Sequence, residues 1–317
     1  MVFICVSLLL LLLTLLLLKA KVSNGIALLI YSVFCLNLLL KIINYPIGKS
    51  TDYIAYSLVF SSIKEMSFTE MMQTDYFEYL FRIMSWGLLH LFGEHTFSIF
   101  VYSSNILIAI ALYRLFKNKM LAPFALFIYT NGPTFFPMST NIIRQVLVIS
   151  LILIILSMRS RFKLVLAICL PFIHASSIVF AIYFFLHKYF KEKWLLVIAV
   201  ITAIMFLTHL NQPFFEGLGY DSKYTEATFY ELAGAESEGN RIDFFIFTTL
   251  TMVLAIYLRS KDQLSTYIYK YILLSGILFY CLGFQAFSDR LGIFVWYTVF
   301  ITGPLLINYF VERMKFE

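Results

Sequence analysis

A series of long apolar runs, separated by short polar segments, limits what this chain can fold into. Hydrophobic residues make up 61% of the 317 residues and charged residues only 13%, a balance that excludes a soluble globular domain. A helix of roughly 20 apolar residues spans a bilayer. The sequence therefore predicts an all-α, polytopic membrane protein.

Most of the apolar runs are long enough to be membrane helices. They cover residues 2–18, 25–44, 79–92, 95–113, 121–138, 142–158, 164–186, 194–209, 244–258, 267–288 and 291–310. The first lacks the basic start and cleavage site of a secretory signal, which predicts a retained helix. Residues 79–92 are too short to cross. Pro171 and His174 interrupt residues 164–186, which predicts a broken helical hairpin.

Charge in the short loops predicts the topology. Basic clusters lie near residues 19–21, 114–119, 159–163, 188–193, 259–261 and 313–315. All six clusters become cytoplasmic if residues 164–186 enter the membrane and return to the same side. Residues 79–92 must then dip into the membrane or lie flat on it rather than cross. This gives about eleven transmembrane or half-spanning helices in a single domain, 1–317, with the N-terminus outside and the C-terminus cytoplasmic. Two long outer loops remain, 45–78 and 210–243, the second expected to be a mobile flap.

Composition also limits the cofactors and partners. The four cysteines, Cys5, Cys35, Cys169 and Cys281, all lie inside apolar runs and lack metal-ligand spacing. We therefore expect neither a metal nor a cofactor. The net charge of +6 comes from the short loops, so it does not indicate binding to nucleic acid.

Arg144 lies at the start of an apolar helix, where the helix dipole is already positive. A second positive charge there favours a bound anion such as a phosphate or diphosphate. The alternative is an ion pair with a neighbouring carboxylate that joins two helices. Asn141 and Gln145, four residues apart, would share the same helix face and bind phosphate or sugar. Ser139 or Thr140 would cap the helix.

Other polar residues are expected at the same outer side of the membrane, where ionisable groups are functional candidates. Arg290 could be a second diphosphate ligand or pair with Asp289, and Arg241 is a further candidate ligand. His174, at the helix break, could position a sugar hydroxyl, accept its proton or contact phosphate. It could equally be a hydrogen-bonded structural group.

Two carboxylates flanked by tyrosines fit a carbohydrate site. Asp52 precedes Tyr53 and Tyr56, and Glu78 lies in a second tyrosine-containing segment. Carboxylates accept hydrogen bonds from sugar hydroxyls, and aromatic rings pack on the apolar faces of sugars. Either carboxylate could act as the general base, or both could be ordinary solvated acids.

The order of these motifs resembles the EpsG-like family of bacterial polysaccharide polymerases, which is close in role to the Wzy-type O-antigen and capsule polymerases. The resemblance covers nearly the whole chain. The usual Gly-x-Asp spacing is lengthened here by Lys49-Ser50-Thr51. The motifs are Asp52-Tyr53-Ile54-Ala55-Tyr56, Glu78, the Asn141/Arg144/Gln145 helix start, His174 with Ser176, and Arg290.

The resemblance implies metal-independent glycosyl transfer without a cofactor, at the outer face of the bacterial inner membrane. The substrate would be oligosaccharide repeat units on undecaprenyl diphosphate in the lipid bilayer, with a flippase and a chain-length regulator as partners. Arg144 and Arg290 would hold the diphosphate, while Asp52, Glu78 or His174 would serve the acceptor. The alternatives are a flippase or transporter of the lipid-linked sugar, and a membrane acyltransferase.

Overall fold

The computed structural model describes residues 8, 11–12, 14–18, 23–46, 48, 51–132, 135–218, 240–285 and 288–313. Within these ranges the chain consists of α-helices, short 3-10 helices and turns, and no β-strand occurs. The all-α prediction is therefore confirmed for the described part of the chain. Most of the first predicted run, 2–18, and residues 219–239 of the predicted flap lie outside it.

The helices belong to two compact units, which we describe separately. Unit 1 comprises Met1–Phe185 with Ile307–Glu317, and unit 2 comprises Leu186–Leu306. The helices of unit 1 are α2 (Asn24–Ile43), α3 (Thr51–Glu65), α4 (Phe68–Gln73), α5 (Tyr79–Phe92), η2 (Gly93–His95), α6 (Thr96–Leu115), α7 (Leu121–Asn131), α8 (Phe135–Asn141), α9 (Ile143–Ser157), α10 (Phe162–Ile173), η3 (Ala175–Ser177) and most of α11 (Ile178–Leu186). Unit 2 contains α12 (Glu192–Leu207), α13 (Asn211–Gly217), α15 (Ile242–Ser260), α16 (Thr266–Leu282), α17 (Asp289–Trp296) and the start of α18 (Val299–Arg313). The single-domain expectation stays a prediction.

Several of these helices are long and apolar enough to cross a membrane. Four described stretches qualify: Asn24–Ile43, Tyr79–Leu115, Ile242–Ser260 and Asp289–Arg313. Glu192–Leu207 and Asn211–Gly217, bent by 104°, make a fifth if they form one span. The other apolar helices have only 10–17 residues and are shorter than the roughly 30 Å hydrocarbon core. The structure thus supports four or five spans, and the count of eleven is not confirmed.

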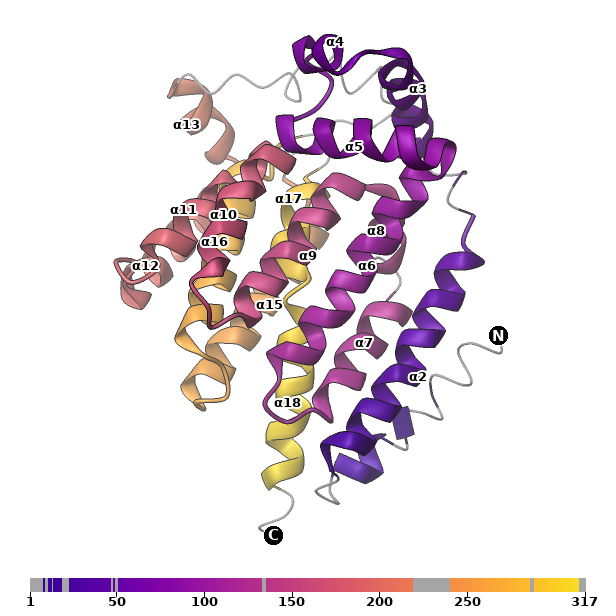
Figure 1. Ribbon diagram of the computed structural model, residues 1–317. Helices are drawn as coiled ribbons and strands as arrows, with labels where there is room; N and C mark the ends of the chain where they lie inside the picture. The colour runs from indigo at the N-terminus through magenta and orange to yellow at the C-terminus, as the bar shows by residue number, and fades with distance from the viewer. Residues whose placement is uncertain are drawn as a thin grey trace. The chain divides into compact units, whose positions relative to one another are not determined.

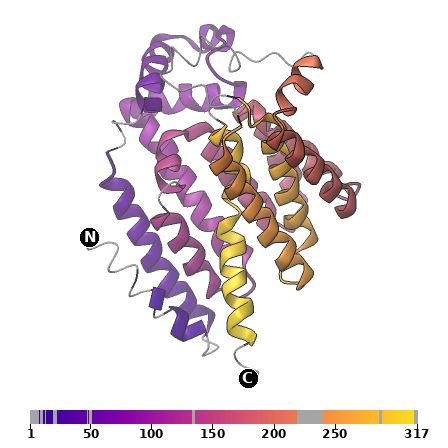
Figure 2. The ribbon, with the colours of Figure 1, turned by 180° about the vertical axis from the view of Figure 1, so that it is seen from behind.

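In unit 1, helices α2, α6, α7 and α9 pack side by side (Figures 1 and 2). Helices α3, α4 and α5 form a layer across one end of this group (Figure 1). The chain turns from α5 into α6 at Gly93, whose φ of 58° and ψ of −129° are not helical. Helix α5 therefore runs across the end of α6 rather than extending it.

The segment 45–78, predicted to be a long outer loop, is largely helical, because α3 and α4 occupy most of it. Its place outside the membrane stays a prediction. Tyr56, Phe60 and Ile63 are buried and recur at the spacing of one helix face. The start of α4 is fixed by a capping box, in which Ser67 and Glu70 exchange hydrogen bonds with each other's backbone N–H. Tyr56, one of the tyrosines that suggested a carbohydrate site, is thus part of the buried face of an amphipathic helix.

A buried polar network joins α6, α7 and α8. The hydroxyls of Tyr129 and Ser139 both donate to Asn105 Oδ1, at 2.5 and 3.4 Å. Thr140 Oγ1 donates to the carbonyl of Pro137. The prediction that Ser139 or Thr140 caps the Arg144 helix is therefore wrong. That helix begins after a break at Ile142, which makes no side-chain cap.

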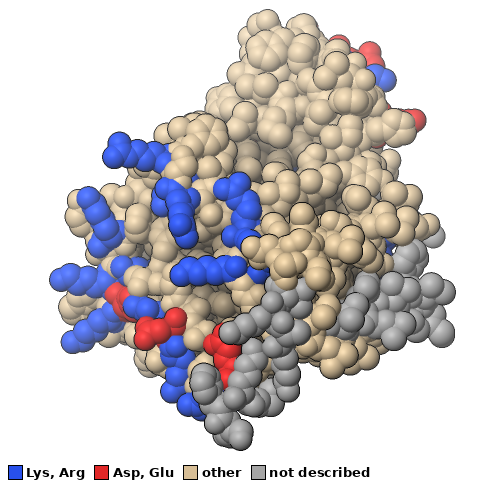
Figure 3. All heavy atoms as spheres, turned by 60° about the horizontal axis from the view of Figure 1, so that its bottom comes forward, with Lys and Arg blue, Asp and Glu red and all other residues tan. Residues whose placement is uncertain are grey.

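Basic side chains gather at the end of unit 1 opposite α3–α5. The turns that join α6 to α7 and α9 to α10 both lie at this end (Figure 1). They carry Lys117 and Lys119, and Arg159 and Arg161. The face of the chain drawn in Figure 3 carries many Lys and Arg side chains and few Asp and Glu side chains. The asymmetry follows the loop pattern on which the topology prediction rests.

Unit 2 is organised around α16, which packs against α12, α15 and α17. The buried amides of Asn211 and Asn240 hydrogen-bond each other, and Asn211 also donates to the carbonyl of Tyr280. Trp296 Nε1 donates to Thr248 Oγ1 at 2.9 Å. These hydrogen bonds offset the free-energy cost of burying polar groups in apolar surroundings.

Gly93 and Gly87 form a matched pair that tests the α5–α6 turn. A Cβ at either position would meet no atom within 4 Å, but only Gly93 has a positive φ. We expect Gly93→Ala to lower the free energy of unfolding by about 1–3 kcal/mol through backbone strain. Gly87→Ala, inside α5, should be neutral or stabilising. Thermal unfolding of the detergent-purified variants measures both, and equal melting temperatures would contradict the assigned turn.

Candidate functional site

Three helix ends meet in unit 1 at the end covered by α5 (Figure 1). Glu78 is the N-cap residue of α5, Arg144 lies in the first turn of α9, and His174 follows the last residue of α10. Arg144 and His174 lie 66 and 96 positions after Glu78 in the sequence. Their side chains are 19–25% exposed, so the cluster is largely buried but reachable.

The Glu78 carboxylate is the anion at the positive end of α9. Arg144 Nη1 lies 2.6 Å from Glu78 Oε2, an ion pair that is also a hydrogen bond. Arg144 Nε donates to the Tyr56 hydroxyl at 2.9 Å. The structure thus contains the neighbouring-carboxylate pair that the sequence left as one of two interpretations. Arginine has five N–H donors, and these two contacts leave others for a ligand.

The break after α10 gives Glu78 two further partners. His174 is extended, with φ −156° and ψ 116°, so the regular helical hydrogen bonding stops there as predicted. The Ala175 N–H, at the start of the next helical turn, donates to Glu78 Oε1 at 2.9 Å. His174 Nδ1 lies 3.2 Å from the same oxygen. Pro171 itself does not interrupt α10, which continues to Ile173.

These contacts keep Glu78 ionised. Burial alone would raise the pKa of its carboxyl, but the His174 hydrogen bond, the Arg144 charge and the Ala175 N–H together lower it from 4.5 to about 2. An ionised carboxylate only accepts hydrogen bonds, so Nδ1 of His174 carries the proton of their contact. In the neutral imidazole, Nε2 is then the basic nitrogen.

An aromatic cluster surrounds the guanidinium of Arg144. Its Cζ lies 5.0 Å from the ring centre of Phe77 and 5.9 and 6.0 Å from those of Tyr56 and Phe81. Tyr56 is itself 7% exposed and stacks on Phe77. Its ring packs against other aromatic side chains, and its hydroxyl positions Arg144. Direct contact between Tyr56 and a sugar stays a prediction.

Arg82 holds the turn that leads to Glu78, a role that was not predicted from the sequence. The residue is 4% exposed, and its guanidinium donates to the carbonyls of Met71, Met72 and Phe77. The signal was present in the sequence, because Arg82 is a basic residue near the start of an apolar helix, as Arg144 is. Here the anionic partner is replaced by carbonyl oxygens.

The other predicted site residues of unit 1 are not members of this cluster. Asn141 Oδ1 accepts from the backbone N–H of Asp52 at 3.3 Å, and so binds the first turn of α3. Asn141 ends α8 whereas Gln145 lies in α9, so the prediction that they share one helix face is wrong. Gln145 is 3% exposed. Tyr53 packs edge-on against Phe97, on the side of α3 that borders a pocket.

The other two predicted arginines lie in unit 2. Arg241 precedes α15 and forms an ion pair with Asp243 at 2.5 Å, with its guanidinium 3.8 Å from the ring centre of Phe244. Arg290 lies in the first turn of α17, next to Asp289. A diphosphate-binding role for either stays a prediction. No group of three His, Cys, Asp or Glu among the described residues could hold a metal ion.

Glu78 predicts a specific acid sensitivity. Because its pKa is about 2 in the folded protein against 4.5 ordinarily, its stabilising contribution is complete above pH 4.5 and is lost as the pH falls toward 2. The stability gap between the wild type and Glu78→Gln should shrink over this range by up to about 3 kcal/mol. Denaturant unfolding in detergent from pH 7 to pH 2.5 measures the gap. A gap independent of pH would contradict the assigned ion pair.

Comparison with known proteins identifies the family. The model of the EpsG family matches residues 28–315 and thus contains every residue of the cluster. No curated protein and no solved structure matches the chain. Because the family match extends over most of the sequence and both units, the chain belongs to the EpsG family.

Proposed function

We propose that this protein is a polysaccharide polymerase that joins lipid-diphosphate-linked oligosaccharide units by glycosyl transfer. EpsG membership and the apolar helices suggest a membrane polymerase of polysaccharide biosynthesis. The observation that supports the reaction best is the Arg144–Glu78–His174 cluster, which combines a cation for a phosphate with a positioned imidazole base. The proposed site of action is the outer face of the bacterial inner membrane, on undecaprenyl-diphosphate donors.

His174 is the best candidate for the general base. A carboxylate with a pKa of about 2 is a poor proton acceptor near neutral pH, so Glu78 is better suited to orienting the imidazole than to acting as the base. The same division of labour between carboxylate and imidazole occurs in catalytic triads. Asp52, whose backbone binds Asn141 three residues before Arg144, is the alternative acceptor-binding carboxylate.

The proposed step balances without a further reactant. The oxygen of the acceptor hydroxyl forms a bond to the anomeric carbon of the donor sugar, and its proton passes to His174 Nε2. The bond between the anomeric carbon and the diphosphate oxygen breaks, and the lipid diphosphate leaves with the electron pair. Donors of Arg144 that Glu78 and Tyr56 do not use would bind this leaving group as its charge develops.

Complementation of a gene deletion tests the proposal. We expect deletion to leave single repeat units, and Arg144→Ala to fail to restore the polysaccharide ladder on a gel. Arg144→Lys keeps the charge but not the two-pronged geometry and should restore it only in part. Arg161→Ala, an exposed arginine at the opposite end of unit 1, is the control at matched membrane levels. Arg290→Ala in the same assay tests the predicted second arginine.

The phenotypes of the deletion separate the alternatives. Loss of even single surface units would favour the flippase or transporter. An unchanged ladder with lost decoration would favour the acyltransferase. A full ladder in Arg144→Ala would contradict the proposed role of this residue.

His174→Asn separates catalysis from structure. Asparagine retains a donor near the position of Nδ1 for Glu78 but lacks the basic Nε2. We expect unchanged thermal stability and a loss of polymerisation rate of about 100-fold or more, measured with purified protein in proteoliposomes. A rate within threefold of the wild type would exclude His174 as the base.

Chelation tests the expected metal independence. If arginine charge stabilises the leaving group, polymerisation in proteoliposomes should continue in EDTA at an undiminished rate. Strict loss of activity that a divalent ion restores would contradict this mechanism.

A further inference from the structure

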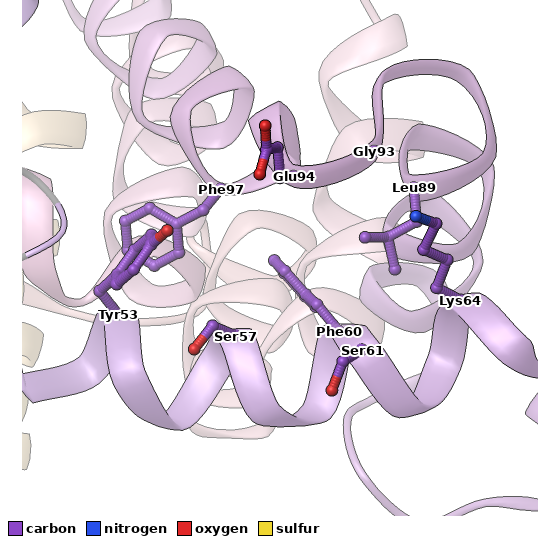
Figure 4. Close-up of a pocket in the computed structure, with 9 residues that line it drawn as sticks. All are labelled: Tyr53, Ser57, Phe60, Ser61, Lys64, Leu89, Gly93, Glu94 and Phe97. Carbon is purple, nitrogen blue, oxygen red and sulfur yellow. The ribbon is translucent and has the colours of Figure 1, made fainter.

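A pocket of about 200 Å³ lies in unit 1 beside the candidate site, between α3 and the turn from α5 into α6 (Figure 4). Its volume corresponds to about seven water molecules at roughly 30 Å³ each, which is enough for one sugar ring. None of the contacts that form the Arg144–Glu78–His174 cluster uses a residue that lines this pocket.

The floor of the pocket is aromatic and apolar. Phe60, Phe97 and Leu89 are 6%, 2% and 4% exposed, and all three line it. Figure 4 shows Tyr53 and Phe97 at one side, Phe60 rising from α3, and Leu89 at the other side. These buried side chains make the floor apolar, and the half-buried ring of Tyr53 at the side of the pocket is an aromatic surface on which the C–H face of a sugar would pack.

The rim of the pocket is polar and exposed. The hydroxyls of Ser57 and Ser61 donate to the carbonyls of Ile54 and Leu58, which leaves their oxygens as acceptors toward the pocket. Lys64 and Glu94 complete the rim. Among the described residues neither forms an ion pair, so one donor group and one acceptor group face a ligand.

One layer of aromatic rings separates the pocket from the candidate site. The ring centre of Tyr56 lies 5.7 Å from those of both Phe60 and Phe97, which line the pocket. On the other side the Tyr56 hydroxyl accepts from Arg144. A sugar in the pocket would therefore lie one ring layer from the reacting groups.

We propose that this pocket binds one neutral hexose unit of the oligosaccharide that reacts at the candidate site. The inference rests on the proposed polymerase function and assigns it a sugar subsite remote from the reacting bond. An apolar ring-lined floor with a few polar groups at the rim is the usual form of a selective small-ligand site. The charges of Lys64 and Glu94 at the rim balance each other, which favours an uncharged sugar over a phosphate or an acidic sugar.

Direct binding tests the subsite. The probe is the oligosaccharide released by mild acid from the lipid-linked unit that accumulates in the deletion strain. Its affinity for the full-length protein in nanodiscs is measured by titration calorimetry. We expect Glu94→Gln, which keeps the size of the side chain, and Ser61→Phe, which fills the pocket, each to weaken binding about fivefold or more. In proteoliposomes the same variants should raise KM by a similar factor while kcat stays within twofold.

Matched controls and separate readouts keep the two proposals distinct. Glu65→Gln and Thr69→Phe alter exposed residues that do not line the pocket and should leave affinity unchanged. Absence of probe binding, or equal affinity in the pocket and control variants, would overturn the subsite whatever the ladder shows. A full ladder in Arg144→Ala would overturn the polymerase mechanism whatever the calorimetry shows.

Discussion

The Glu78 carboxylate joins three parts of the chain that are distant in sequence. Two of its partners, the Arg144 guanidinium and the Ala175 N–H, lie at the starts of helical segments, where unpaired N–H groups carry partial positive charge. Removing this one anion would leave Arg144 largely buried and uncompensated, which is costly. The arrangement of α5, α9 and α10 at this end of unit 1 therefore depends on one ion-pair network.

The surrounding residues make the network rigid. Arg82 binds three carbonyls of the segment before Glu78, and the aromatic cluster packs around Arg144. Such support limits the geometries open to the reacting groups, and preorganised charge is the largest contributor to catalysis in many enzymes. In the proposed polymerase, the pocket beyond Tyr56 would bind a part of the oligosaccharide away from the reacting bond.

The sequence predicted the helical class and the break at His174, and it identified Arg144 as an unusual charge at the start of an apolar helix, because each creates a local signal in apolar surroundings. It did not predict that 45–78 folds into α3 and α4, since tyrosines and acids resemble a loop unless the spacing of Tyr56, Phe60 and Ile63 is considered. The partner choice of Glu78 depends on tertiary packing between segments. The break at Ile142, which separates Asn141 from Gln145, likewise has no strong local signal.

A double-mutant cycle tests the central claim most directly. Polymerisation rates of the wild type, Glu78→Gln, Arg144→Gln and the double variant are compared in proteoliposomes with purified lipid-linked repeat units. If the two residues act as one unit, the double variant is no slower than the slower single variant, because each substitution already removes the shared interaction. Rate losses that multiply in the double variant would show that the residues act independently, and would contradict the account.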